Sequence, residues 1–132
     1  MVAESSTVHR LAVMLKALAE ETRLQMVLLL AEWGELCVCD LEHALDITQS
    51  KASRHLRYLL NSGIVNDSRR GVWMHYRLAE DLDPCVAQII ACLRGAVPVE
   101  ELAKARERLS AWLATEGKDV PGCRSCGADE EG

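Results

Sequence analysis

The pattern of apolar positions along the first half of the chain is helical, with short polar breaks between successive segments. Residues such as Val8, Leu11, Leu15 and Leu18 recur every three or four positions, as on one face of a helix. The pattern predicts four helices, over about residues 8–19, 22–31, 39–45 and 51–61.

Residues that commonly cap helices precede three of these segments. Ser6 or Thr7 is placed to cap the first helix, Thr22 the second, and Thr48 or Ser50 the fourth. A hydroxyl at such a position accepts a hydrogen bond from a backbone N–H that has no partner within the helix.

The period then changes from helical to extended. Residues 64–66 and 73–78 predict two short strands, and Arg69, Arg70 and Gly71 predict the turn between them. Two further helices are predicted, over about 84–94 and 99–115, each opened by a proline. This order predicts a mainly α fold with a small β-hairpin, a winged helix-turn-helix. We expect one domain over residues 1–116 and a flexible tail, 117–132, that contains Cys123 and Cys126.

The net charge of −5 hides an uneven distribution. Between residues 48 and 77, six basic residues face only Asp67, a local net charge of +5, so the remainder carries −10. A basic face on an acidic body is typical of a protein that binds a polyanion.

In a helix-turn-helix, the second helix of the pair enters the major groove of double-stranded DNA. The predicted DNA-binding residues are Gln49, Ser50, Lys51, Ser53, Arg54, His55 and Arg57 on this helix, and Arg69 and Arg70 on the hairpin. Most charge runs are merely solvated helix faces, but the clustering of basic residues on both the helix and the hairpin favours DNA binding. His55 has a second interpretation, as a structural histidine under the helix.

Other functional classes find little support in the sequence. The longest apolar run, Met26 to Ala31, is too short to cross a bilayer, and no secretion signal is evident. We therefore expect a soluble, cytoplasmic protein with reduced thiols and no membrane partner. Because there is neither a phosphate-binding glycine loop nor a catalytic triad pattern, we do not expect an enzyme.

Cys37 and Cys39 are candidate ligands for a soft ion because thiolates bind such ions and a helix amino terminus lowers the pKa of a thiol. If both residues lay in a regular helix, two positions apart, their side chains would point about 200° apart. Chelation therefore requires that the first turn unwinds or that Cys37 lies outside the helix. Unwinding would disturb the DNA-reading helix, which makes it a candidate mechanism. The alternative is that both are small buried hydrophobes.

The other four cysteines are less specific. Cys85 and Cys92 lie on one helical stripe with Ile89, a pattern that favours core or dimer interface. Cys123 and Cys126 have three equal interpretations: they supply a third ligand, they form a second site, or they are simply reactive thiols.

Three segments together resemble the ArsR/SmtB family of metal-responsive repressors, and within it the arsenical-resistance repressors. They span residues 35–41, 49–56 and 71–78, with the sequences ELCVCDL, QSKASRHL and GVWMHYRL. The resemblance implies a homodimer formed through the first and fifth helices. It also implies that the ion-free dimer binds an inverted repeat in DNA and dissociates when the inducer binds.

By the same resemblance, Cys37 and Cys39 match two of three arsenic-binding cysteines, and Glu42 stands where the third would be. Either Cys123 or Cys126 supplies the third thiol, or two suffice, as for a methylated arsenical. Cadmium- and lead-sensing relatives share the segment but add cysteines from an amino-terminal arm that here has none. We therefore expect release by As(III) or Sb(III). The alternatives are a cadmium-, lead- or zinc-responsive repressor and a thiol-based redox sensor.

Overall fold

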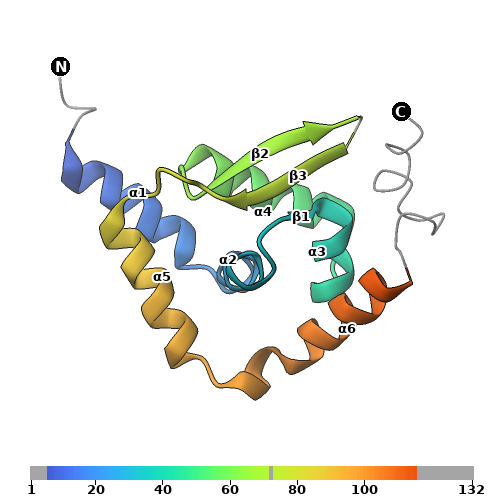
Figure 1. Ribbon diagram of the computed structural model, residues 1–132. Coiled ribbons are helices and arrows are strands. Elements are labelled where there is room, and N and C mark those ends of the chain that lie inside the picture. Colours follow the sequence, from blue (N-terminus) through green and yellow to red (C-terminus); the bar gives the residue numbers. More distant parts are fainter. Residues whose placement is uncertain (1–5, 72, 116–132) are drawn as a thin grey trace.

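The computed structural model describes residues 6–71 and 73–115 (Figure 1). Its elements are, in chain order, α1 (Thr7–Leu18), α2 (Glu21–Trp33), β1 (Leu36–Cys37), α3 (Val38–Leu45), α4 (Gln49–Asn61), β2 (Val65–Arg70), β3 (Trp73–Leu78), α5 (Pro84–Ala96), the 3₁₀ segment η2 (Val99–Leu102) and α6 (Ala103–Ala114). The predicted fold class, mainly helical with a small sheet, is confirmed. The predicted tail and its two cysteines lie outside the described residues.

The core forms around α2, which runs through the middle of the molecule (Figure 1). Its later half, from Met26 to Leu30, is buried throughout. Helix α4 rests on this core through Leu56 and Leu59, both completely buried. Because α3 also packs against α4, the two helices form a pair in which α4, the helix predicted to read DNA, lies at the surface. Asp46 ends α3 in the left-handed conformation, with φ +56°, and so begins the turn between them.

The sheet has three antiparallel strands in the order β1-β3-β2. Strand β2 is longer than predicted and continues to Arg70, which pairs with Trp73 of β3. Arg69 and Arg70 therefore belong to the strand, and placing them in the turn was wrong. Exposed edge strands commonly carry charged residues, and that composition resembles a turn in sequence.

Strand β1 was not predicted at all. It consists of Leu36 and Cys37, paired with Tyr76 and His75 of β3. A two-residue strand has no periodicity, so only its partner reveals it. This pairing connects the segment before α3 directly to the wing, the β2–β3 hairpin.

Two of the three helix caps predicted from the sequence are confirmed. The hydroxyls of Ser6 and Thr48 accept hydrogen bonds from backbone N–H groups three residues on, which begins α1 and α4. For α2 the prediction of Thr22 was wrong, because the Glu20 carboxylate accepts from the N–H of Arg23 and the helix begins one residue earlier. The last predicted helix begins as 3₁₀ turns and becomes α-helical at Ala103.

The two late helices lie on different sides of the molecule. Helix α5 packs beside α1, whereas α6 packs along α3 (Figure 1). Within the described part of the chain, no helix combines the length and apolarity needed to span a membrane.

Candidate metal centre and nucleic-acid interface

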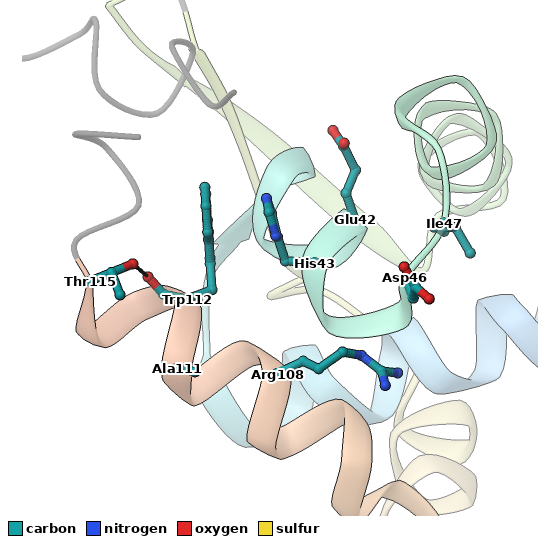
Figure 2. Close-up of a pocket in the computed structure, with 8 residues that line it drawn as sticks. All are labelled: Glu42, His43, Asp46, Ile47, Arg108, Ala111, Trp112 and Thr115. Carbon is teal, nitrogen blue, oxygen red and sulfur yellow. Dashed lines mark hydrogen bonds between the residues drawn. The ribbon is translucent and has the colours of Figure 1, made fainter. Parts of the chain in front are cut away.

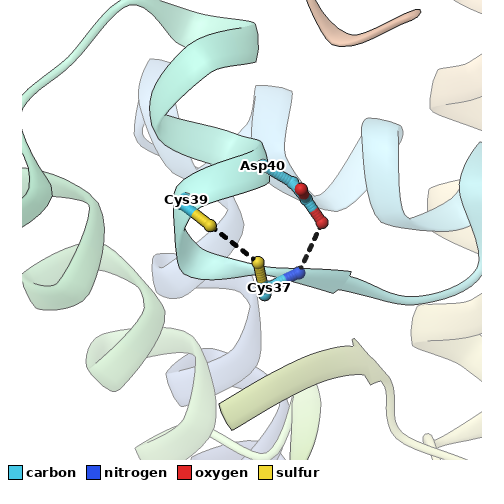
Figure 3. Close-up of side chains that lie close together, drawn as sticks. All are labelled: Cys37, Cys39 and Asp40. Atoms are coloured by element: carbon cyan, nitrogen blue, oxygen red, sulfur yellow. Dashed lines mark hydrogen bonds between the residues drawn. The ribbon is translucent and has the colours of Figure 1, made fainter. Parts of the chain in front are cut away.

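Three buried side chains converge where β1 ends and α3 begins: Cys37, Cys39 and Asp40 (Figure 3). The Sγ atoms of the two cysteines lie 3.0 Å apart. One ligand atom from each of the three residues lies within 4.8 Å of the other two. The structure therefore brings together the two cysteines predicted as ligands and adds a carboxylate.

The geometry removes the obstacle expected from a regular helix. Cys37 is the N-cap of α3 and has extended backbone angles, φ −94° and ψ 172°, so it lies outside the helix. Its side chain can therefore point toward that of Cys39 with the first turn of α3 intact. The two sulfurs come together without unwinding of α3, so chelation does not require the unwinding mechanism considered from the sequence.

The carboxylate of Asp40 joins this site to a distant helix. Its Oδ2 accepts a hydrogen bond from the backbone N–H of Cys37 at 2.9 Å, and its Oδ1 accepts one from Nε1 of Trp112 at 2.9 Å. Asp40 is only 9% exposed and Trp112 7%. No local pattern indicates this contact, because Trp112 lies on α6, 72 residues away from Asp40.

The donor set fits a thiophilic ion held by two sulfurs. Two thiolates on one tetrahedral zinc, with bonds of about 2.3 Å, lie about 3.8 Å apart, so small movements of Cys37 and Cys39 would accommodate an ion. The remaining donor is a carboxylate oxygen, which is a harder ligand than sulfur. Among the residues that the structure describes, no third cysteine belongs to the cluster.

Glu42, at the expected position of a third thiol, lies in a cleft of about 510 Å³ between α3 and α6 (Figure 2). His43, Arg108 and Trp112 line the same cleft (Figure 2). Burial raises the pKa of Glu42, although the charge of His43 opposes the shift. Glu42 therefore belongs to the cleft and not to the thiol cluster.

Cys85 and Cys92 are both exposed on α5. The expectation that they belong to the core was wrong, and the dimer-interface alternative stays a prediction. Cys123 and Cys126, the other candidate ligands, lie outside the described residues.

The reading helix α4 presents its polar side to solvent. Most of its predicted DNA-binding residues are exposed, and Ser53 is half-buried; the exposed ones are Gln49, Ser50, Lys51, Arg54 and Arg57. On the opposite side, Ala52, Leu56 and Leu59 are buried against the domain. The cap at Thr48 fixes where the helix begins and therefore which residues stand at its exposed amino end.

His55 is turned inward, as in the structural alternative. Its side chain is 14% exposed, with Nδ1 3.8 Å from a carboxylate oxygen of Glu20 and 3.4 Å from Nη1 of Arg23. Burial lowers the pKa of His55, and nearby cations including Arg23 lower it further, against the opposing effect of Glu20. These contacts make His55 part of the support for α4.

The two predicted wing arginines differ in their surroundings. Arg69 and Arg70 are both exposed, but Nη2 of Arg70 forms an ion pair with Oε2 of Glu35 at 2.7 Å. The same carboxylate oxygen lies 3.9 Å from Nδ1 of His75. This role of Glu35 could not be predicted from the sequence, because it depends on the pairing of β1 with β3.

The two cysteines therefore belong to elements that adjoin α4 and the wing, the two elements predicted to contact DNA. Cys39 belongs to α3, which packs against α4, and Cys37 belongs to β1, which pairs with β3 of the wing.

Known proteins similar to this chain are transcriptional regulators. A family model described as "Bacterial regulatory protein, arsR family" matches residues 20–67. The chain is 56% identical to the arsenical resistance operon repressor of Escherichia coli over 75 residues, 57% of this chain and 64% of that protein. It is 45% identical to the arsenic resistance transcriptional regulator ArsR1 of Pseudomonas putida over 89 residues, 67% of each.

Solved structures of similar fold agree with these relatives. The AntR antimony-specific transcriptional repressor superposes with a TM-score of 0.56 at 34% identity, covering 64% of this chain and 74% of AntR. The homodimeric winged helix-turn-helix domain of Mb0332 from Mycobacterium bovis gives 0.61 at 30% identity, covering 73% and 85%. The winged helix-turn-helix prediction is thereby confirmed.

Proposed function

The chain belongs to the arsR family of bacterial regulatory proteins, and from that premise we propose that it is a dimeric repressor released from operator DNA when As(III) or Sb(III) binds Cys37 and Cys39. One observation carries the proposal: the buried thiol pair lies where β1 ends and α3 begins, and β1 pairs with the wing while α3 packs against α4. An ion bound there is in position to change how both elements meet DNA.

DNA binding rests on the exposed basic face. Lys51, Arg54 and Arg57 project from α4, and Arg69 and Arg70 from the wing. In this arrangement α4 enters the major groove while the wing contacts the flanking backbone. Gln49, Ser50 and Ser53 lie near the amino end of α4, where base edges are read, and His55 supports the helix from below.

Dimer formation rests on an apolar surface formed by α1 and α5. Val8 and Leu15 of α1 are large hydrophobic residues exposed in the single chain, and Cys85 and Cys92 are exposed on the neighbouring α5. Covering this surface with a second copy places the two reading helices around a two-fold axis, which requires an operator with matching palindromic half-sites.

The release step requires only a moderate coupling. Allosteric proteins typically change the affinity for a second ligand by about 1–3 kcal/mol, or about 5- to 150-fold. A specific complex with a Kd of about 10⁻⁸ to 10⁻¹¹ M would then dissociate at working concentrations without any unfolding of the repressor.

The donor set and the relatives together favour a metalloid inducer. Two adjacent sulfurs suit thiophilic ions, and the relatives named above respond, by name, to arsenic and antimony. A cadmium resistance regulator of Staphylococcus aureus is also similar, 38% identical over 66 residues, so cadmium belongs in the same test.

The test is a titration of the protein on an operator duplex selected by the wild-type protein from random DNA. We expect arsenite or antimonite to release the duplex, and Cys37→Ser or Cys39→Ser to bind it normally but to resist release. Cys85→Ser and Cys92→Ser remove thiols from the proposed dimer surface and leave the ion site intact, so variants that gel filtration shows to dimerise normally serve as matched controls and should respond like the wild type. Release of both single mutants at wild-type arsenite concentrations would show that the thiol site is misassigned. Release by Cd²⁺, Pb²⁺ or Zn²⁺ alone would select the other inducer class.

The proximity of the two sulfurs favours a second candidate, a redox switch. A hydroperoxide oxidises two thiols to a disulfide and is itself reduced to an alcohol and water. The same titration with a hydroperoxide, without metal ions, separates the two functions. Release that dithiothreitol reverses would support the redox function, whereas release by arsenite under full reduction supports the metalloid function.

A further inference from the structure

Helix α6 reaches the thiol site through a single carboxylate. Trp112 donates its indole N–H to Oδ1 of Asp40, while Oδ2 of Asp40 accepts the backbone N–H of Cys37. Both hydrogen bonds are 2.9 Å long and buried, so water does not compete for either acceptor. The side chain of Asp40 is therefore held from two sides, by α6 and by the residue that supplies a sulfur.

The orientation of Trp112 is itself fixed by neighbouring contacts. Its ring stacks on that of His43, with 3.5 Å between the ring centroids and 11° between the planes, and Figure 2 shows the two rings nearly parallel. One turn earlier on α6, Nε of Arg108 donates to the carbonyl oxygen of Ala44 at 2.9 Å. These contacts lock α6 along α3 and aim the indole N–H at Asp40.

We propose that Trp112 is a positioning residue for ion binding at Cys37 and Cys39 and that it acts through Asp40. The proposal rests on the function proposed above, because it assigns to α6 a part in the same site. With Trp112 in place, the carboxylate stays on the Cys37 N–H and keeps this residue at the cap, where its sulfur faces Cys39.

Loss of the indole donor has a defined physical effect. Oδ1 of Asp40 would remain in a buried environment without a hydrogen bond, a state that costs free energy. The carboxylate would turn to regain a donor and release the Cys37 N–H. The two sulfurs would then be less well arranged before the ion arrives, and more of the binding free energy would be used to order them.

Linkage makes the effect reciprocal. If the docking of α6 favours ion binding, then ion binding must alter the docking of α6 by the same free energy. Trp112 therefore serves as an intrinsic fluorescent reporter of the site, whereas Trp33 on α2 and Trp73 on the wing lie in other elements.

The test compares Trp112→Phe with Trp33→Phe in the full-length reduced protein, using arsenite as the probe. Phenylalanine keeps an aromatic ring for stacking but has no N–H. We expect Trp112→Phe to weaken arsenite binding about tenfold, the size of one hydrogen bond to a charged acceptor, and Trp33→Phe to change it less than twofold. Equal arsenite affinity in the two variants would overturn the proposal.

A double-mutant cycle shows whether the effect passes through Asp40. In an Asp40→Ala background, the further change Trp112→Phe should leave arsenite affinity unchanged. An undiminished tenfold loss in that background would mean that Trp112 acts by another route, and the proposal would fail.

A fluorescence experiment covers the case in which Trp112→Phe folds poorly. In the double variant Trp33→Phe/Trp73→Phe, Trp112 is the single tryptophan, and arsenite should change its emission in proportion to occupancy. Adding Cys37→Ser should abolish the change. Constant emission at saturating arsenite would overturn the proposal. If the wild type binds no arsenite, the proposed inducer is wrong, and the same comparisons with Cd²⁺ decide the role of Trp112.

Discussion

Glu35→Gln should strengthen operator binding, because it frees a wing arginine. Arg70 is ion-paired with Glu35 at 2.7 Å, and a guanidinium held by a carboxylate is less available to a DNA phosphate. The glutamine keeps the length of the side chain and its hydrogen-bonding capacity but removes its charge. The change leaves Cys37 and Cys39 untouched, so the inducer response should persist.

The expected magnitude follows from the exposure of the pair. The side chain of Arg70 is 53% exposed and that of Glu35 25%, so solvent screens much of their attraction. Exposed pairs of this kind contribute about 0.2–1 kcal/mol. With two wings in a symmetric dimer, the gain in binding is about 0.4–2 kcal/mol, or about 2- to 30-fold in the Kd.

Fluorescence anisotropy of the selected operator duplex, at fixed ionic strength, measures this effect. In an Arg70→Gln background Glu35→Gln should have no effect, whereas in an Arg69→Gln background its effect should persist. Equal strengthening in the Arg70→Gln background would refute the ion-pair explanation and leave only a general loss of negative charge.

Three further predictions follow from single buried or half-buried positions. Glu42→Cys adds a thiol one helical turn after Cys39 and should tighten arsenite binding at least about tenfold by equilibrium titration, while Glu42→Gln, the control, should not. The pKa of His55 is lowered from 6.5 by burial, so the unfolded state binds the proton more readily and stability falls as the pH decreases through 6.5 and below. His55→Gln should flatten this dependence in urea unfolding between pH 7.5 and 5, and an unchanged slope would contradict the assignment. Leu56→Ala should cost about 2–5 kcal/mol of unfolding free energy, because the side chain is completely buried under the reading helix. Leu113→Ala, at an exposed position, should cost about 0.5 kcal/mol or less, and similar losses for the two variants would refute the role of Leu56.

The elements that could be predicted from sequence are those governed by local rules. Helical spacing located the long helices, and the hydroxyls at Ser6 and Thr48 marked where two of them begin. Cys37 and Cys39 were identifiable because their spacing carries its own chemistry. The side chains that face inward on α4, such as Leu56 and Leu59, also follow from periodicity alone.

The features that could not be predicted depend on partners far away in sequence. Strand β1 exists only because β3 lies beside it, and this strand places Cys37 outside α3. The contact of Asp40 with Trp112 and the ion pair of Arg70 with Glu35 leave no pattern in the sequence near these residues. A local pattern identifies which residues have the chemistry of a site, but tertiary contacts decide which of them are held, neutralised or left exposed.

The pairing of β1 with β3 also limits how this protein can be re-engineered. The segment from Glu35 to Leu41 reads in sequence as a self-contained sensor that could be exchanged for that of another regulator. Leu36 and Cys37, however, pair with Tyr76 and His75 in strand β3 of the wing. A chimera that replaces the segment alone would join a new strand to an old partner. A functional exchange of specificity therefore has to transfer both strands together.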